Sequence, residues 1–350
     1  VNFDYFIERR KDILTNRKVL PTYLAANLPI ANIGKVDNKG YELSVNWRDR
    51  IHDFRYHIGF NLAYAKNKIV FQDEVPYPYD YMRKTGKPVG QQMGYKYDGF
   101  FSEEDVAKYE TERGKSIPDH GTGYIPKPGD VKYKDISGPD GVPDGVIDDY
   151  DKTNIGSPMP KFTFGWTNTF RYKNFDLSVF INGSYGNKVY NYLSMKLTHM
   201  NSPWTNQLNA VNGRAQLVPI NPNKVYEDGT MWYNDVSNVM VANPGASIPR
   251  ATINDPNDND RISDRYIEDG SYIRLKNISL GYTFPKKTID KLGLSNLRIY
   301  ANIQNLLTIT GYDGYDPEIG ASTSSVNVYG LDNGRYPSPT VYSFGLNVSF

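Results

Sequence analysis

The chain has 350 residues, of which 40 are basic and 39 acidic, so its formal net charge is only +1. Bulk charge therefore gives the chain no attraction to nucleic acid or to an anionic surface. Cysteine is absent, which excludes disulfides, thiol chemistry and any zinc site built on cysteine.

Tyrosine is unusually abundant, with 29 residues against 15 Phe and 4 Trp. A ring with one polar end suits places where apolar and aqueous phases meet, including membrane interfaces and sugar-binding surfaces. No apolar run approaches the roughly 18 residues of a transmembrane helix, so none is predicted. Residue 1 already lies within an alternating stretch, VNFDYFIE, and we expect the chain to be a fragment of a longer protein.

A period of two dominates the chain and predicts β-strands. The alternation predicts about eight of them, spanning residues 1–10, 33–47, 54–71, 161–172, 175–185, 271–284, 295–308 and 342–350. In the strand that begins at Ser271, the alternation changes phase, which predicts a β-bulge near Lys276 and Asn277.

The connections between these strands alternate between long and short. The long ones span about 11–32, 72–160, 186–270 and 309–340. A β-sandwich has no reason to place all its long loops at one end, whereas an outer-membrane barrel has short periplasmic turns and long extracellular loops. Several polar strand faces are rich in Gly, Ser, Asn and Ala, as expected of a crowded lumen. The sequence therefore predicts an all-β, antiparallel up-and-down transmembrane β-barrel with long extracellular loops.

The last predicted strand, YSFGLNVSF, has two distinct faces. Its large apolar residues alternate with small or polar ones and are Tyr342, Phe344, Leu346, Val348 and Phe350. Nine residues suffice for a tilted strand to cross the bilayer core, so we expect the apolar face to meet lipid. The strand must pair with a first barrel strand that we do not expect in this chain, because an open edge would leave backbone groups unpaired in lipid.

An acidic, glycine-rich loop is the one candidate metal site in the sequence. Its carboxylates are Asp135, Asp140, Asp144 and Asp148. Hard cations such as calcium bind several oxygen ligands from loops with glycine at the sharp turns, which is one interpretation. The spacing is not that of an EF-hand, and solvated carboxylates in Asx and Gly turns are the other interpretation. No other cofactor is predicted.

Nothing in the sequence predicts an enzyme. The four histidines show no metal-ligand spacing, and no nucleophile elbow, phosphate-binding loop, dinucleotide fingerprint or zinc-protease motif occurs.

The long connections contain aromatic residues expected to be exposed. They are Tyr77, Tyr79, Tyr81, Trp204, Trp232 and Tyr233. Such rings stack on sugars or on peptide side chains, so they are candidate substrate contacts. Equally, they could pack the loops together or contact a partner protein.

Several stretches, in the expected order along the whole chain, resemble the C-terminal barrel region of SusC/RagA-type TonB-dependent transporters of Bacteroidetes. They are KVDNKGYELSVNW, GDVKYKDISGPDGVPDGVIDDYDKTNIGSPMPKFTFGW, SYIRLKNISLGYTFP, LRIYANIQNLLTIT and the final YSFGLNVSF. The acidic loop departs from the family pattern, because PDGVP is inserted into it.

The resemblance implies that the 350 residues supply only the last eight or so strands of a barrel of the roughly 22-stranded plugged class. The N-terminal plug and the earlier strands would lie outside this chain. It further implies that the protein lies in a Gram-negative outer membrane and that a SusD-like surface lipoprotein covers it as a lid. TonB would act through the missing part, and the nutrients would be glycans or oligopeptides. The terminal strand would be read by the barrel-assembly machinery. A passive porin-like channel and a secreted carbohydrate-binding β-protein remain alternatives.

Overall fold

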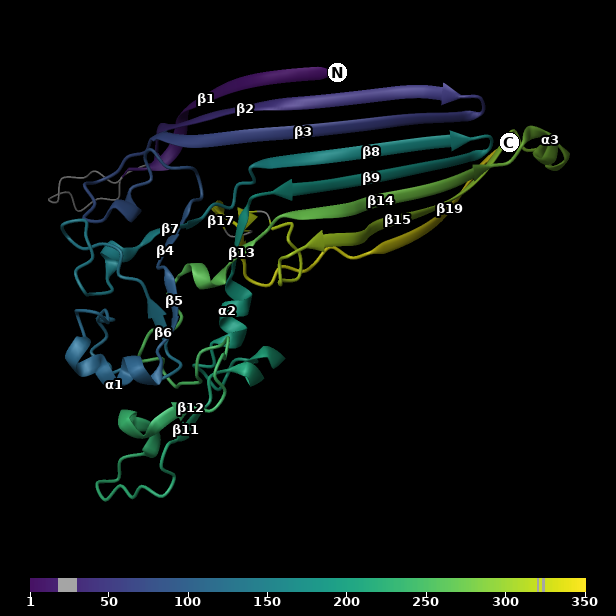
Figure 1. Cartoon of the computed structure of the whole chain (residues 1–350). Helices are drawn as coiled ribbons and strands as arrows, with labels where there is room; N and C mark the ends of the chain where they lie inside the picture. The colour runs from purple at the N-terminus through teal and green to yellow at the C-terminus, as the bar shows by residue number, and fades with distance from the viewer. Residues whose placement is uncertain (18–29, 320, 323–324) are drawn as a thin grey trace.

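The computed structural model describes the whole chain except residues 18–29, 320 and 323–324 (Figure 1). Its main feature is an eight-stranded sheet in the order β1-β2-β3-β8-β9-β14-β15-β19, in which each strand is antiparallel to its neighbours. The strands are β1 (Asn2–Asn16), β2 (Ile30–Ile51), β3 (Phe54–Phe71), β8 (Phe162–Tyr172), β9 (Phe175–Tyr185), β14 (Tyr272–Thr283), β15 (Asn296–Thr310) and β19 (Val341–Ser349). This up-and-down order confirms the predicted fold class.

The first two strands are longer than the sequence predicted. Pairing of β1 with β2 continues past Arg10 through two register shifts, to Asn16 opposite Ile30. The expected long connection at about 11–32 is therefore wrong at both of its ends. Residues 17–29 are left of it, and 18–29 lie outside the described residues. The strand ends could not be recognised in the sequence, because the register shifts interrupt the alternation on which the prediction rested.

The predicted β-bulge in β14 is confirmed. Against β9, Leu275 pairs with Ile181 and Asn277 pairs with Phe180, so Lys276 is an extra residue without an opposite partner. An extra residue of this kind changes which face the following side chains occupy, which explains the change of phase in the sequence.

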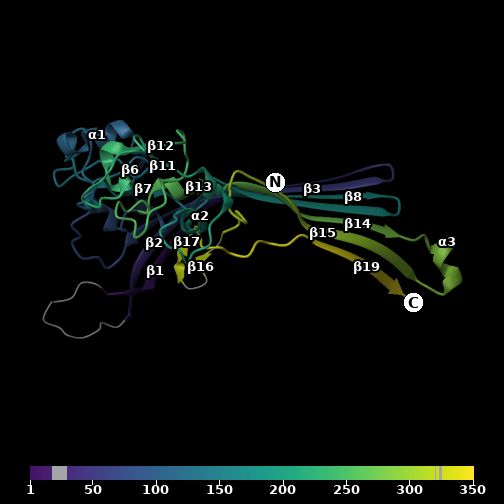
Figure 2. The same ribbon diagram turned by 90° about the horizontal axis from the view of Figure 1, so that it is seen from below.

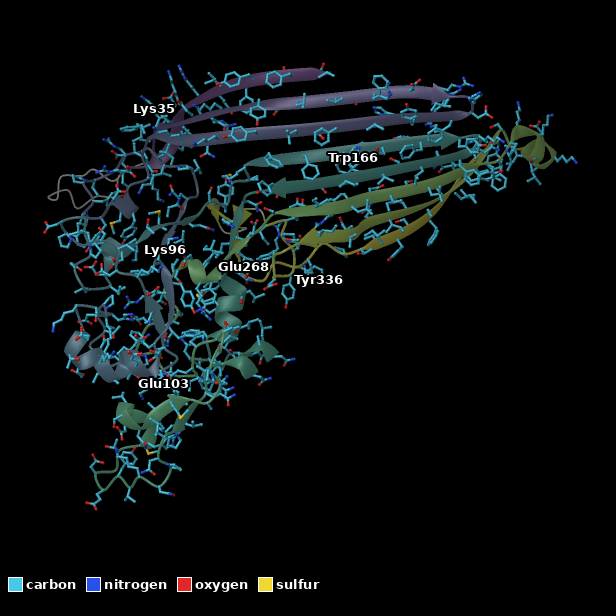
Figure 3. All side chains as sticks on the ribbon, viewed as in Figure 1. Lys35, Lys96, Glu103, Trp166, Glu268 and Tyr336 are labelled. Carbon is cyan, nitrogen blue, oxygen red and sulfur yellow. The ribbon has the colours of Figure 1, made fainter. Side chains whose placement is uncertain are left out.

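The sheet has one apolar and one polar face. Val45, Phe60 and Trp166 lie opposite one another on three neighbouring strands and form part of an apolar row; Trp166 is labelled in Figure 3. The next row of the sheet, on the opposite face, contains Asn61 and Gly165. Among the described residues, no helix is both long enough and apolar enough to span a membrane.

The long connections gather at one end of the sheet, and the short turns lie at the other (Figures 1 and 2). The turns are residues 52–53, 173–174 and 284–295, and the last of them contains α3 (Lys286–Ile289) and η7 (Asp290–Leu292). We call the described parts of residues 72–161, 186–271 and 311–340 the loop platform.

Each connection of the loop platform has small elements of its own. The first has η1 (Asp80–Met82), β4 (Gln92–Gly94), β5 (Tyr97–Phe100), α1 (Glu103–Glu112), β6 (Val131–Tyr133), η2 (Asp149–Asp151) and β7 (Thr153–Gly156). The second has β10 (Lys188–Asn191), α2 (Tyr192–Thr198), η3 (Asn209–Gly213), β11 (Leu217–Pro219), η4 (Trp232–Asn234), η5 (Val236–Asn238), β12 (Val239–Val241), η6 (Asp264–Tyr266) and β13 (Ile267–Asp269). The third has β16 (Ala321–Ser322), β17 (Ser325–Tyr329) and β18 (Leu331–Asp332).

The hydrophobic cores of the molecule lie in the loop platform. Helix α1 starts at a capping box, in which Ser102 and Asp105 satisfy each other's backbone N–H groups, and it buries Val106 and Tyr109 against Phe101. A second core contains Tyr95, Val131, Tyr133 and Ile147, and a third contains Tyr190, Met195 and Tyr266. The loops therefore fold as packed structure that can hold side chains in fixed positions.

Candidate functional site in the loop platform

A buried polar network joins the first two connections of the platform. Asp130 is completely buried, and its Oδ1 lies 2.7 Å from Arg250 Nε. The Lys127 backbone N–H donates to Asp130 Oδ2 at 2.8 Å, and Asn259 Nδ2 donates to Oδ1 at 3.2 Å. Burial raises the pKa of Asp130, while the Arg250 guanidinium and these donors act in the opposite direction. The carboxylate thus holds together segments that are far apart in the sequence.

Two asparagines extend this network along β6. The Val131 N–H donates to Asn259 Oδ1 at 2.6 Å, and Asn257 Nδ2 donates to the Val131 carbonyl at 3.0 Å. Both asparagines are almost fully buried. Their side-chain amides take the place of a neighbouring strand, because they satisfy backbone groups that would otherwise be buried without partners.

A cavity of about 460 Å³ lies where all three connections meet the end of the sheet. Its lining includes three basic residues, Arg83, Lys84 and Lys87, together with apolar side chains and tyrosines. The tyrosines are Tyr81, Tyr190, Tyr192 and Tyr329. Its size and its mixture of apolar walls with a few polar groups are typical of ligand-binding cavities.

The structure brings two of the predicted aromatic residues together beside this cavity. The rings of Tyr79 and Tyr81 stack at 5.8 Å, and Tyr150 meets Tyr79 edge-on at 4.6 Å. The Tyr81 hydroxyl donates to Asp149 Oδ2 at 3.1 Å, which fixes the ring at the cavity wall. Tyr77, on the same stretch, is half-buried.

The other predicted aromatic residues lie apart from Tyr79 and Tyr81. Trp232 contacts Tyr233 edge-on at 5.7 Å, and Lys127 Nζ lies 5.4 Å from the Tyr233 ring. Trp204 is 93% exposed. Within the described part of the chain, no ring contact links these three residues to Tyr79 or Tyr81. The six aromatic residues thus form at least two separate groups, and their role as substrate or lid contacts stays a prediction.

The carboxylates of the acidic loop bond mainly to nearby backbone. Asp135 accepts from the Gly145 N–H at 2.6 Å, Asp144 from the Val146 N–H at 3.1 Å, and Asp148 from the Tyr150 N–H at 2.7 Å. The fourth, Asp140, is exposed. These are turn and cap bonds of the kind that Asp makes without a metal. Calcium at this loop stays a prediction.

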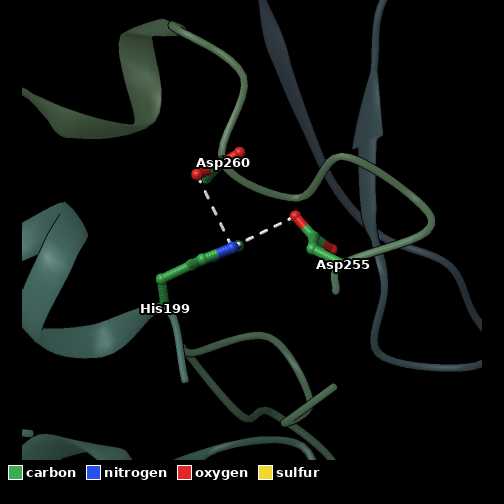
Figure 4. A group of neighbouring side chains, drawn as sticks. All are labelled: His199, Asp255 and Asp260. Atoms are coloured by element: carbon green, nitrogen blue, oxygen red, sulfur yellow. Dashed lines mark ion pairs between the residues drawn. The ribbon is translucent and has the colours of Figure 1, made fainter. Parts of the chain in front are cut away.

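The structure reveals a different acidic group, which the sequence did not predict. In the described part of the chain, the one set of three or more metal-ligating side chains with ligand atoms within 4.8 Å of one another is His199, Asp255 and Asp260 (Figure 4). His199 follows α2, and the two carboxylates belong to the stretch NDPNDND, residues 254–260. The density of Asp and Asn in that stretch is the only sequence signal, and the histidine is too far along the chain to be matched to it.

The terminal strand has the predicted two faces. β19 pairs with β15, so that Phe344 lies opposite Ala301 and Leu346 opposite Ile299. Tyr342, Phe344, Leu346, Val348 and Phe350 are all exposed, and Phe344 is 85% exposed. Their role as a barrel-assembly signal stays a prediction.

Comparisons with known proteins agree with this architecture. No family model matches the chain. TonB-dependent receptor P3 of Formosa agariphila is 33% identical over 371 residues, which cover 100% of this chain and 32% of the receptor. TonB-dependent receptor SusC of Bacteroides thetaiotaomicron is 26% identical over 98% of this chain and 29% of SusC. The chain thus spans about a third of the length of the curated relatives that it matches.

Solved structures show the same fold. The RagAB peptide transporter superposes with a TM-score of 0.64 over 99% of this chain and 33% of the other, at 17% identity. The RagAB peptide importer in its closed-closed state gives a TM-score of 0.65 at the same identity. The chain is therefore homologous over its whole length to TonB-dependent receptors, SusC among them, and its resemblance to the SusC/RagA type of transporter is confirmed.

Proposed function

We propose that this chain forms part of the barrel wall and of the outer loops of a TonB-dependent importer in the outer membrane of a Gram-negative bacterium. The observation that supports this most directly is the division of the molecule. A sheet with an exposed apolar face joins, at one end only, a packed loop platform that contains a cavity of about 460 Å³. With lipid around the sheet, its exposed apolar side chains are kept out of water; with water around the platform, its polar surface stays hydrated.

In this proposal the loop platform faces the cell exterior. Nutrient oligomers, either glycans or oligopeptides, bind between it and a SusD-like lipoprotein that covers the loops. TonB, driven by the inner-membrane proton gradient, acts on a plug that belongs to the part of the protein outside this chain. No bond is made or broken, so the chain is not an enzyme.

The cavity indicates how such an oligomer would be held. Tyr81 places a fixed aromatic side chain at the cavity wall, because its hydroxyl donates to Asp149 and its ring stacks on Tyr79. Arg83 and Lys84 add positive charge to the lining of the cavity, which favours the carboxylates of acidic glycans or of peptides. Both nutrient classes offer these groups, so the choice between them needs an uptake measurement.

The test is uptake of labelled acidic glycans and acidic oligopeptides by cells that express the complete protein, with and without functional TonB. We expect one class to be taken up, and uptake to require TonB. A Tyr81→Ala variant should lower uptake, whereas Trp47→Ala, on the apolar face of the sheet, should leave it unchanged. Uptake that continues without TonB would instead support a passive channel, and a complete protein that stays soluble without detergent would rule out a membrane barrel.

A further inference from the structure

We propose that His199, Asp255 and Asp260 bind a divalent transition-metal ion, such as zinc, which fastens the end of α2 to the loop at residues 253–263 (Figure 4). The role is structural: the ion would hold two segments of the second long connection together. The inference concerns the folding of the loop platform and does not depend on what is transported.

The distances between the three side chains suit one shared ion. His199 Nε2 lies 3.2 Å from Asp255 Oδ2 and 3.6 Å from Asp260 Oδ2. Two ligands that each lie about 2.1 Å from a tetrahedral zinc are roughly 3.4 Å apart. The two separations from His199 bracket that value, and all three ligand atoms lie within 4.8 Å of one another.

The histidine lacks the hydrogen bonds that a buried imidazole ordinarily makes. Its side chain is only 2% exposed, and neither ring nitrogen has a hydrogen-bond partner among the described residues. Nε2 nevertheless points at the two carboxylates (Figure 4). Buried polar groups without partners are rare and call for an explanation, and a metal ion on Nε2 supplies one.

The carboxylates divide into one that is held in place and one that is accessible. Asp255 Oδ1 accepts from Asn259 Nδ2 at 2.7 Å, which leaves Oδ2 without a hydrogen bond and facing His199. This amide contact is the kind of supporting bond that orients a metal ligand. The Asp260 side chain is 31% exposed, which gives an ion and a completing water a route from solvent.

The donor set points to the class of ion. An imidazole nitrogen with two carboxylate oxygens suits zinc and other first-row divalent ions, whereas calcium and magnesium favour oxygen ligands alone. The nearby Asp130 network gives the site a rigid base, because Asn259 bonds both Asp255 and Asp130.

The test measures zinc binding by the complete purified protein in detergent, after chelation and removal of the chelator. Calorimetry with zinc chloride is run on the parent protein and on His199→Gln and Asp260→Asn. The control is His57→Gln, a sheet histidine whose Nε2 lies 3.2 Å from Asn46 Oδ1. We expect one zinc equivalent that weakens at least about tenfold in both site variants, because loss of even a supporting residue costs 10–100-fold. The control should bind zinc as the parent does.

Anomalous scattering at the zinc edge would place the ion between the three side chains. Absence of stoichiometric zinc from the parent protein, or equal affinity in the parent and both site variants, would overturn the proposal and leave a buried histidine–carboxylate ion pair. If His199→Gln fails to assemble, Asp260→Asn decides alone. Its side chain is partly exposed, so unchanged affinity in that variant would overturn the site.

Discussion

The eight-stranded sheet and the loop platform bury their side chains in opposite ways. Of the buried hydrophobic residues in the described chain, only Ile69 and Tyr272 belong to the sheet, and both lie near its platform end. The platform instead buries Tyr109, Val131 and Tyr133 completely or almost so, whereas the sheet leaves rings such as Phe344 exposed. The two regions suit different solvents. The platform packs its apolar side chains in an interior away from water, whereas the sheet exposes its apolar side chains on one face.

This contrast also separates the roles of polar groups. In the platform, a buried carboxylate such as Asp130 joins distant segments, and its removal from water is offset by an ion pair and several donors. On the polar face of the sheet, Arg298 makes a two-point contact with Asp176, at 3.1 and 2.6 Å, across Gly281. A side chain at Gly281 would collide with that pair. Polar bonds hold the platform together and line one face of the sheet.

The largest effect is expected from Arg250→Met in the platform. Loss of the cation leaves Asp130 buried without an ion partner, which costs about 3–5 kcal/mol. Hydrogen exchange of the complete protein should show faster exchange in residues 127–133 and 250–260 and no change in the sheet. Lys108→Met is the control, because its ion pair with Glu104 is exposed and should not matter measurably. Equal exchange in the variant and the parent would show that the network does not hold the platform together.

The next effect probes the sheet. Phe344→Arg places a charge on the apolar face near the middle of β19, and should lower the free energy of unfolding in lipid by about 2–4 kcal/mol. Ser343→Arg is the matched control, since the neighbouring residue points to the polar face. Denaturant unfolding of the complete protein in bilayers measures both. Similar losses in the two variants would contradict the assignment of the faces.

A smaller effect is expected in the platform when the pH is lowered to 5. Burial lowers the pKa of His120 to about 3, so the folded protein keeps this imidazole neutral where an unfolded chain would protonate it. The stability that depends on neutral His120 is therefore complete above pH 6.5 and falls by about 1.4 kcal/mol for each pH unit below that, towards pH 3.

Hydrogen exchange of the platform at pH 5 and pH 7.5, corrected for intrinsic rates, measures this loss. His120→Gln removes the titrating group and should flatten the dependence, whereas His57→Gln in β3 should not. An unchanged pH dependence in His120→Gln would assign the acid sensitivity to other groups.

The smallest effect on the fold is expected from Trp204→Ala. An exposed surface residue usually changes stability by less than about 0.5 kcal/mol. If the ring is an anchor for the lid protein or the nutrient, the same change should weaken binding by more than about 1 kcal/mol. The affinity of the complete protein for the lid protein and its affinity for the nutrient, measured separately, decide which of the two Trp204 contacts. Unchanged affinity for both would leave Trp204 without a binding role.

The sheet could be predicted from the sequence because its signal is local. Alternation alone placed β9 at residues 175–185, where the structure has Phe175–Tyr185, and the change of phase located the bulge at Lys276. The prediction stopped short at the end of β1, where register shifts interrupt the alternation. Fold class and strand order follow from such patterns, because in an up-and-down sheet each strand pairs only with the strands that precede and follow it in the sequence of the sheet.

The candidate sites could not be predicted in the same way, because their contacts join distant residues. Asp130 meets Arg250, and His199 meets Asp255 and Asp260, only after the long connections fold together. The acidic loop at Asp135 to Asp148 was the more conspicuous pattern, yet its carboxylates bond mainly to nearby turns. Composition indicates that a loop is acidic, but only the fold determines which carboxylates converge.

In the proposed arrangement, the platform and the short turns lie on opposite sides of one membrane. The chain contains no cysteine, so single cysteines can report this in an otherwise cysteine-free complete protein. We predict that Trp204→Cys, in the platform, reacts with a membrane-impermeant maleimide on intact cells. Lys173→Cys, in the turn between β8 and β9, should react only after the outer membrane is permeabilised. Reaction of both positions on intact cells, or of Lys173→Cys alone, would contradict the account.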